Sequence, residues 1–119
     1  MIEVMISQEG ILIRGHAEYA EEGKDIVCAG ITALTQTLVE SIESLSEDTI
    51  KYDISPGMAA IYYRDLSEKS QTLVDSFFIG VSIIASEFPE NVSVSRETHI
   101  PKRKTPINGL FQPFMGVLI

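Results

Sequence analysis

The sequence predicts an α+β domain, with a mixed or antiparallel sheet of about five strands and two helices packed on one face. Stretches with β-strand character come in pairs, and the two members of each pair are separated by residues typical of turns. Two longer stretches repeat their apolar residues every three or four positions, as amphipathic helices do. Strands and helices do not alternate regularly, and a purely parallel sheet is therefore not expected.

The five strands are expected at residues 2–7, 11–14, 49–54, 58–64 and 92–95. Gln8-Glu9-Gly10 separates the first two, and Ser55-Pro56-Gly57 separates the next two. Proline presets one backbone dihedral of a turn and glycine permits the next. Each pair is therefore predicted to form a hairpin.

The two helices are expected at residues 25–45 and 66–88, and Pro89 ends the second. The apolar face of the first helix consists of Val27, Ile31, Leu34, Leu38, Ile42 and Leu45. The apolar face of the second helix consists of Leu73, Phe77, Val81 and Ile84, and it is widened by Phe78, Ile79, Ile83 and Ala85. A helix apolar around so much of its circumference is either central in the core or covered by a second copy of the chain.

With 119 residues the chain has the length of one domain, and its 45% hydrophobic and 22% charged residues are typical of a globular protein. A single cysteine cannot form an internal disulfide, which suits a reducing compartment. The N-terminus lacks the basic start and apolar run of a signal peptide, and no apolar stretch is expected to span a membrane. We therefore expect a cytoplasmic protein without membrane contact.

Charge divides the chain into an acidic body and a basic tail. Residues 1–95 contain five Lys or Arg against sixteen Asp or Glu, a net −11, whereas residues 96–119 carry four against one, a net +3. An acidic body binds the phosphates of nucleic acid poorly and a cationic peptide better, although the charge also serves solubility alone. The tail, with Lys102-Arg103-Lys104 and an apolar end, is expected to be dispensable for folding. It either packs as core or interface filler or occupies an acidic site.

Cys28 and His16 are the candidate chemical residues. Asp25 is a favoured N-cap residue and places Cys28 third in the first helix, where the peptide dipoles favour a thiolate. His16 precedes Cys28 by twelve residues, across a loop long enough to fold back, and an imidazole there would serve as base. The first-turn amides that favour the thiolate could also stabilise an oxyanion.

For each of the residues and segments near Cys28 and His16, the sequence is compatible with two roles. Asp25 either orients His16 or only caps the helix. Thr32 lies one turn after Cys28 and either reaches its sulfur or bonds back to the Cys28 carbonyl. The loop from His16 to Lys24 is either a flap that orders over a peptide or a solvated loop. The candidate flap residues are Gly15, Ala17, Glu18, Glu21, Glu22 and Gly23.

The sequence contains two motifs, Gly15-His16-Ala17 and Asp25-Ile26-Val27-Cys28-Ala29, in which His16 precedes Cys28 by twelve residues. Through these two motifs it resembles the ribosomal-processing cysteine protease family of bacteria and its phage relatives. The resemblance covers roughly residues 1–95 and includes Pro89-Glu90-Asn91-Val92. The chain departs from the family at Thr32, where serine is usual, and after Arg96, where relatives mostly stop.

The resemblance implies a cysteine endopeptidase with a Cys28–His16 dyad, with Asp25, Ala29 and Thr32 in support and without a cofactor. It also implies a homodimer and a protein substrate, either the N-terminal extension of a large-subunit ribosomal protein or a phage structural protein. The alternative is a non-catalytic dimeric module that binds a protein or senses oxidation through Cys28. Zinc-ligand spacing, a CxxC pair and a phosphate-binding loop are all missing from the sequence, and His99 is expected to be exposed and inert.

Overall fold

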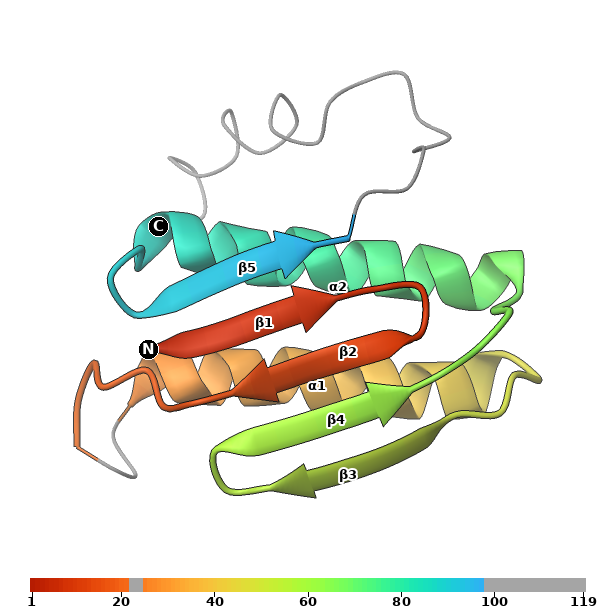
Figure 1. Ribbon diagram of the computed structural model, residues 1–119, viewed down its shortest axis with the longest axis horizontal. Coiled ribbons are helices and arrows are strands. Elements are labelled where there is room, and N and C mark those ends of the chain that lie inside the picture. The colour runs from red at the N-terminus through yellow and green to blue at the C-terminus, as the bar shows by residue number, and fades with distance from the viewer. Residues whose placement is uncertain (22–24, 98–119) are drawn as a thin grey trace.

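The computed structural model describes residues 1–21 and 25–97, which form one five-stranded sheet with two helices along one face (Figure 1). The strands are β1 (Ile2–Ile6), β2 (Gly10–Arg14), β3 (Lys51–Ser55), β4 (Met58–Tyr62) and β5 (Val92–Arg96), and the helices are α1 (Ile26–Leu45) and α2 (Glu68–Glu87). The predicted α+β class is confirmed. The tail beyond Glu97, including His99, lies outside the described residues.

The sheet has the order β3-β4-β2-β1-β5. Both predicted hairpins form, β1 with β2 and β3 with β4, and β2 joins them by pairing antiparallel with β4. The last strand pairs parallel with β1, with Ile2 opposite Val92 and Ile6 opposite Arg96. The strand β5 therefore includes Arg96, one residue beyond the expected end.

The core lies between the sheet and the helices. Alternate residues of the central strands point into it, among them Val4, Ile13 and Ile61, which are at most 7% exposed. From α1 the core receives Val27, Ile31, Thr35, Leu38, Val39 and Ile42. The buried face of the helix thus differs from the expected one by including Thr35 and Val39. The Thr35 hydroxyl donates to the Ile31 carbonyl at 2.7 Å, which satisfies it inside the core. Leu45, expected on that face, is 57% exposed.

The two helices pack against each other through small residues. An added Cβ at Gly80 of α2 would lie 3.0 Å from both methyl carbons of Leu34 on α1. In α2 the fully buried residues are Ser70, Val74, Phe77 and Val81, whereas Phe78, Ile79, Ile83 and Ile84 remain half-buried. The second helix is therefore a core helix with a wide, partly covered apolar flank.

Helix α1 corrects the expectation that no apolar stretch has the dimensions of a membrane span. Among the helices of the described residues, α1 meets that standard by length and composition. Its buried apolar side chains, however, belong to the core between the sheet and the helices, whereas Ile26 and Leu45 at its ends are exposed. A core helix of this length passes the same test, and packing accounts for the buried apolar residues of α1.

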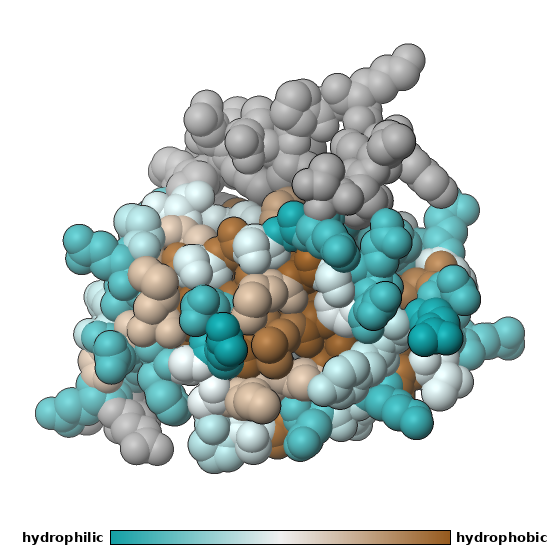
Figure 2. Space-filling view, viewed as in Figure 1, coloured by the Kyte–Doolittle hydropathy of each residue, from teal (hydrophilic) through white to brown (hydrophobic). Residues whose placement is uncertain are grey.

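Neither α1 nor α2, the helices of residues 1–21 and 25–97, covers the opposite face of the sheet. Figure 2 shows apolar side chains gathered across the centre of this face. Met58 and Tyr62 of β4 are 51% and 60% exposed, and they alternate along the strand with Ala59 and Ile61, which point into the core.

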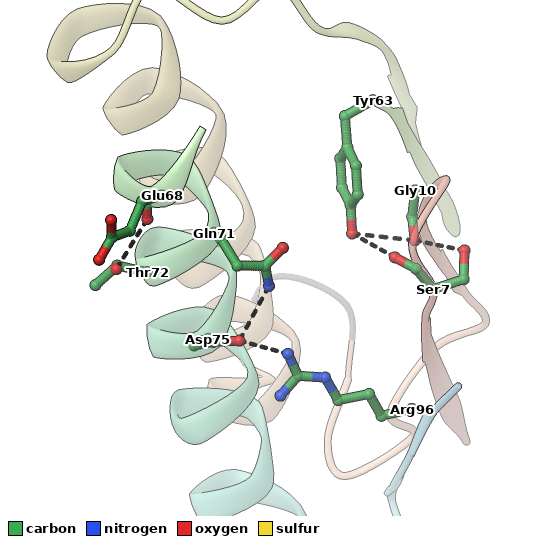
Figure 3. A network of polar contacts seen from close by, with 8 residues as sticks. All are labelled: Ser7, Gly10, Tyr63, Glu68, Gln71, Thr72, Asp75 and Arg96. Atoms are coloured by element: carbon green, nitrogen blue, oxygen red, sulfur yellow. Dashed lines mark hydrogen bonds and ion pairs between the residues drawn. The ribbon is translucent and has the colours of Figure 1, made fainter. Parts of the chain in front are cut away.

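A polar cluster joins the sheet to α2 at the end where β5 finishes (Figure 3). Arg96 forms an ion pair with Asp75 of α2 and lies 4.8 Å from the ring centre of Phe78. Beside them, the hydroxyl of Tyr63 donates to the Ser7 carbonyl at 2.8 Å. Burial raises the pKa of Tyr63 to about 12, while the nearby positive charge of Arg96 opposes the shift. This cluster fixes β5 and the β1–β2 turn to their neighbours.

Candidate active site

Cys28 lies in the first turn of α1, as expected. The Oδ1 atom of Asp25 accepts hydrogen bonds from the amides of Val27 and Cys28, both at 3.0 Å. The amide of Ala29 donates to the Asp25 main-chain carbonyl at 3.0 Å. Asp25 therefore caps the helix, and the dipole of α1 favours negative charge near the Cys28 sulfur.

These bonds bear on the expectation that the first-turn amides serve an oxyanion, which stays a prediction. The amides of Val27 and Cys28 already donate to Asp25, and that of Ala29 donates within the helix. A substrate oxygen would have to displace a carboxylate to reach them. The amides of Val27, Cys28 and Ala29 are therefore already occupied in this structure.

The loop before the helix folds back onto the sulfur. The main-chain amide of Ala17 donates to Sγ of Cys28 at 3.4 Å, and the Ala17 residue is only 1% exposed. On its other side, the Ala17 carbonyl accepts a hydrogen bond from the Asn91 side-chain amide at 2.8 Å. Ala17 is thus held between the turn that leads into β5 and the candidate nucleophile.

The second carboxylate oxygen of Asp25 holds the same loop. Its Oδ2 atom accepts from the amide of Tyr19 at 3.0 Å and from that of Ala20 at 3.3 Å. Desolvation raises the pKa of Asp25, but the hydrogen bonds from the backbone amides, that of Cys28 first, outweigh it and hold the pKa below its usual value. Both Asp25 oxygens bond to main-chain amides, so the structure supports a capping and loop-holding role for this residue.

His16 lies next to the β3–β4 turn. A Cβ added at Gly57 would lie 2.8 Å from Nε2 of His16, so the imidazole passes directly over this glycine. The amide of Gly15 donates to the Gly57 carbonyl at 2.9 Å and holds the loop to the turn. The second hairpin therefore positions His16, a contact that joins residues distant in the sequence.

One pocket brings the two candidate residues together. It has a volume of about 150 Å³ and lies between the start of α1 and the β3–β4 hairpin. Its lining consists of Ile2, Ile13, Gly15, His16, Cys28, Ile31, Thr32, Thr35, Gln36, Ile54, Ser55, Gly57, Met58 and Ala59. His16 and Cys28 share this space with a mainly apolar wall, as a site for a peptide side chain requires.

Thr32 lines the pocket from one turn beyond Cys28 and is exposed. Neither of the two hydrogen bonds considered for its hydroxyl, to the Cys28 sulfur or to the Cys28 carbonyl, is present among the described residues. Ala29 is exposed and is not among the residues that line the pocket. No group of three His, Cys, Asp or Glu side chains that could hold a metal is found in residues 1–21 and 25–97.

The candidate flap residues differ in how firmly the structure holds them. Gly15 and Ala17 are bonded to Gly57, Cys28 and Asn91, and the Tyr19 ring packs edge-on against Phe88 at 5.1 Å. Glu18 and Glu21 are exposed. Glu22 and Gly23 lie outside the described residues, so the opening of this loop stays a prediction.

Sequence reasoning missed three contributors to the site. Gly57 was assigned only to a turn, and Ala17 only to a flap. Asn91 was noticed as part of a motif without a role. Each acts through a contact between distant segments, and no spacing along the chain predicts such contacts. The only indication in the sequence was the residue type, because glycine and asparagine are both common in turns.

A cysteine at a helix N-terminus, a histidine in the same pocket and a main-chain donor at the sulfur are features that a thiol-dependent hydrolase uses. The comparisons with known proteins agree. Residues 1–93 match the family described as cysteine protease Prp, and the chain belongs to this family. It is a cysteine protease by that membership.

Similar proteins carry the same name in several bacteria. The ribosomal processing cysteine protease Prp of Staphylococcus aureus is 28% identical over 101 residues, which cover 79% of this chain and 95% of the relative. That of Bacillus subtilis is 28% identical over 97 residues, covering 73% and 87%. The crystal structure of the S. aureus protease with a covalently linked product peptide is 25% identical, with a TM-score of 0.77 over 82% of this chain and 100% of that one.

Proposed function

We propose that this protein is a processing endopeptidase that removes the N-terminal extension of a bacterial ribosomal protein, with Cys28 as nucleophile and His16 as general base and acid. The observation that carries the proposal is the shared pocket of Cys28 and His16 beside the capped helix. The relatives above are named for ribosomal processing, which favours that substrate over a phage structural protein.

The proposed reaction begins with transfer of the Cys28 thiol proton to His16, favoured by the helix dipole. The thiolate attacks the scissile carbonyl carbon, an S–C bond forms, and the carbonyl electron pair moves onto oxygen. When the oxyanion collapses, the C–N bond breaks and His16 donates its proton to the leaving amine. Water activated by His16 then hydrolyses the thioester and restores the thiol.

The charge of the body fits a cationic peptide substrate. Residues 1–95 carry a net −11, and the exposed Glu18 and Glu21 lie on the loop beside the pocket. Exposed charges act over about 8 Å at physiological salt, so cleavage of a basic peptide should weaken as salt is added. This dependence separates electrostatic recognition from recognition through the apolar pocket.

The decisive experiment incubates the protein with ribosomal protein precursors that carry N-terminal extensions and determines the products by mass spectrometry. A single cut that releases the extension, absent with Cys28→Ala, supports the proposal. Mature ribosomal proteins without the extension serve as the control. Failure to cut any precursor while Cys28 alkylates slowly in the native protein would favour a non-catalytic thiol module instead.

We further infer that the protein works as a homodimer in the cytoplasm. The half-buried flank of α2, formed by Phe78, Ile79, Ile83 and Ile84, offers an apolar surface to a second copy. Light scattering after size-exclusion chromatography tests this inference. A monomer at all concentrations, or a dimer that Ile79→Lys and Ile83→Glu leave intact, would contradict the use of this flank.

A further inference from the structure

We propose that Asn91 is a positioning residue of the active site, which fixes Ala17 so that its main-chain N–H points at the reacting sulfur. The inference rests on the proposed role of Cys28 as nucleophile. Asn91 lies in the turn between α2 and β5, 63 positions after Cys28 in the sequence. The structure connects them through Ala17 alone among the described hydrogen bonds, with Asn91 Nδ2 donating to the Ala17 carbonyl and the Ala17 amide donating to Cys28 Sγ.

The backbone of Asn91 is itself held on both sides. Its amide donates to the Phe88 carbonyl at the end of α2, at 2.9 Å, and its carbonyl accepts from the amide of Ile2 at 2.8 Å, at the start of the parallel β1–β5 ladder. The side-chain amide therefore projects from a fixed point of the sheet. A donor held this rigidly can impose a position on the loop that it contacts.

The loop needs such a fixed point. Glu18, the residue after Ala17, has φ +57°, a left-handed conformation that L-residues with side chains adopt at a cost. A strained residue persists where its surroundings determine its conformation. Asn91 on one side and Asp25 on the other, through the amides of Tyr19 and Ala20, provide this restraint.

The Ala17 N–H is the main-chain donor that the described hydrogen bonds place at the sulfur. The amides of Val27 and Cys28 are engaged by Asp25, whereas that of Ala17 already faces the sulfur. When the Cys28 sulfur attacks, the negative charge moves from the sulfur to the oxygen of the scissile carbonyl group. This oxygen is separated from the sulfur by one carbon atom, so an N–H donor at the sulfur lies within its reach. Asn91 also fixes the residue after His16, so one side chain orients both the donor and the base.

The test uses Asn91→Ala and the isosteric Asn91→Asp, which places an acceptor opposite the Ala17 carbonyl. Cys28 is the only cysteine, so alkylation by iodoacetamide reports on it without any substrate. Losing one hydrogen bond should slow alkylation near neutral pH by roughly threefold to tenfold and move its pH midpoint upward. In peptide cleavage, Asn91→Ala should lower kcat by a larger factor than it changes KM. Glu90→Ala, an exposed neighbour in the same turn, is the matched control and should alter neither.

A folded Asn91→Ala variant with the wild-type pH profile of alkylation and the wild-type kcat would overturn the proposal. Should both variants unfold, the amide resonance of ¹⁵N-labelled wild-type protein decides. The Ala17 N–H signal should shift with the ionisation of Cys28 and stay constant in Cys28→Ala, and a signal unaffected by Cys28 ionisation would refute the geometry. If alkylation responds as expected but no precursor is cleaved, the positioning role stands and the proposed substrate is wrong.

Discussion

The imidazole of His16 lies over Gly57, close enough that a Cβ at Gly57 would come within 2.8 Å of Nε2. Gly57 has φ +77°, which the tight turn after Pro56 requires. Because the atom that a new Cβ would meet belongs to the end of a side chain, the ring can yield while the fold is kept. The glycine thus both closes the hairpin and leaves space for the candidate base.

Gly57→Ala should therefore impair activity more than stability. Displacing a catalytic group by about 1 Å costs up to about a hundredfold in rate, and we expect a loss of roughly tenfold to a hundredfold in kcat/KM. Strain at the positive φ should cost about 1 kcal/mol of the free energy of unfolding. Steady-state cleavage and urea unfolding measure the two effects. Pro56→Ala in the same turn is the control, and full activity of Gly57→Ala would show that the ring contact has no functional role.

Removal of the nucleophile or the base tests the dyad. Cys28→Ala should abolish cleavage with the fold intact, since alanine is a strong helix former. His16→Ala should lower kcat about a hundredfold or more, the usual contribution of general acid–base catalysis. The two losses should not add, because nucleophile and base act as a unit. Cleavage by Cys28→Ala at the wild-type rate would assign the activity to other residues or a contaminant.

The sequence predicts the fold well where local patterns decide it. Helix α1 begins where Asp25 indicated, and both hairpins form at the predicted turns. It predicts less where packing decides. Thr35 is buried with its hydroxyl satisfied by a bond within the helix, while Leu45, the last residue of α1, is 57% exposed. Apolar periodicity alone does not distinguish these cases.

The candidate site shows the same division. Cys28, His16 and the Asp25 cap follow from a short motif, so the sequence reveals them. Ala17 and Asn91 act through a main-chain donor and a contact across 74 positions, for which the sequence has no local pattern. Residue identity indicates the chemistry, whereas the hydrogen bonds that aim it arise only when the turn before β5 meets the loop before α1.

Tyr63 should make the protein labile at high pH. Burial raises its pKa to about 12 from the usual 10.0. The folded state holds the phenol proton more tightly than the unfolded chain, so this contribution is complete below pH 10.0 and is lost as the pH approaches about 12. Tyr63→Phe should remove this pH dependence and, through the lost bond to Ser7, cost about 1 kcal/mol at neutral pH.

Urea unfolding at neutral and alkaline pH measures both effects of Tyr63→Phe. The control is Tyr62→Phe, because Tyr62 is the neighbouring residue on the open sheet face and is 60% exposed. Tyr62→Phe should leave the alkaline profile unchanged. If Tyr63→Phe and the wild type lose stability equally between pH 10 and 12, burial of the Tyr63 phenol does not govern the alkaline transition.

Asp25→Asn separates the two functions of the Asp25 carboxylate. Asparagine has one acceptor oxygen and caps helices nearly as well as aspartate, so the bonds to Val27 and Cys28 can persist. The bonds from the second oxygen to the amides of Tyr19 and Ala20 are lost, because the asparagine amide donates and cannot accept them. The loop should loosen while α1 stays capped, and we expect cleavage to fall by about tenfold through the displaced Ala17 donor and His16.

The pH dependence of stability checks the same carboxylate independently of activity. The folded pKa of Asp25 lies below its usual 3.8, so the carboxylate stabilises the fold above that value and this contribution is lost as the pH falls through the folded pKa. Asp25→Asn should remove this acid-labile part. Asp48→Asn is the matched control. Asp48 lies between α1 and β3, and the hydrogen bond from the Ser67 hydroxyl lowers the pKa of its carboxyl. It should reduce acid lability likewise yet leave cleavage unchanged, because the hydrogen bonds described for Asp48 join it to Ser67 at the start of α2 and to Ser46 at the end of α1, away from the start of α1. If both substitutions reduced cleavage equally, Asp25 would act through overall stability and not through the loop that carries His16 and Ala17.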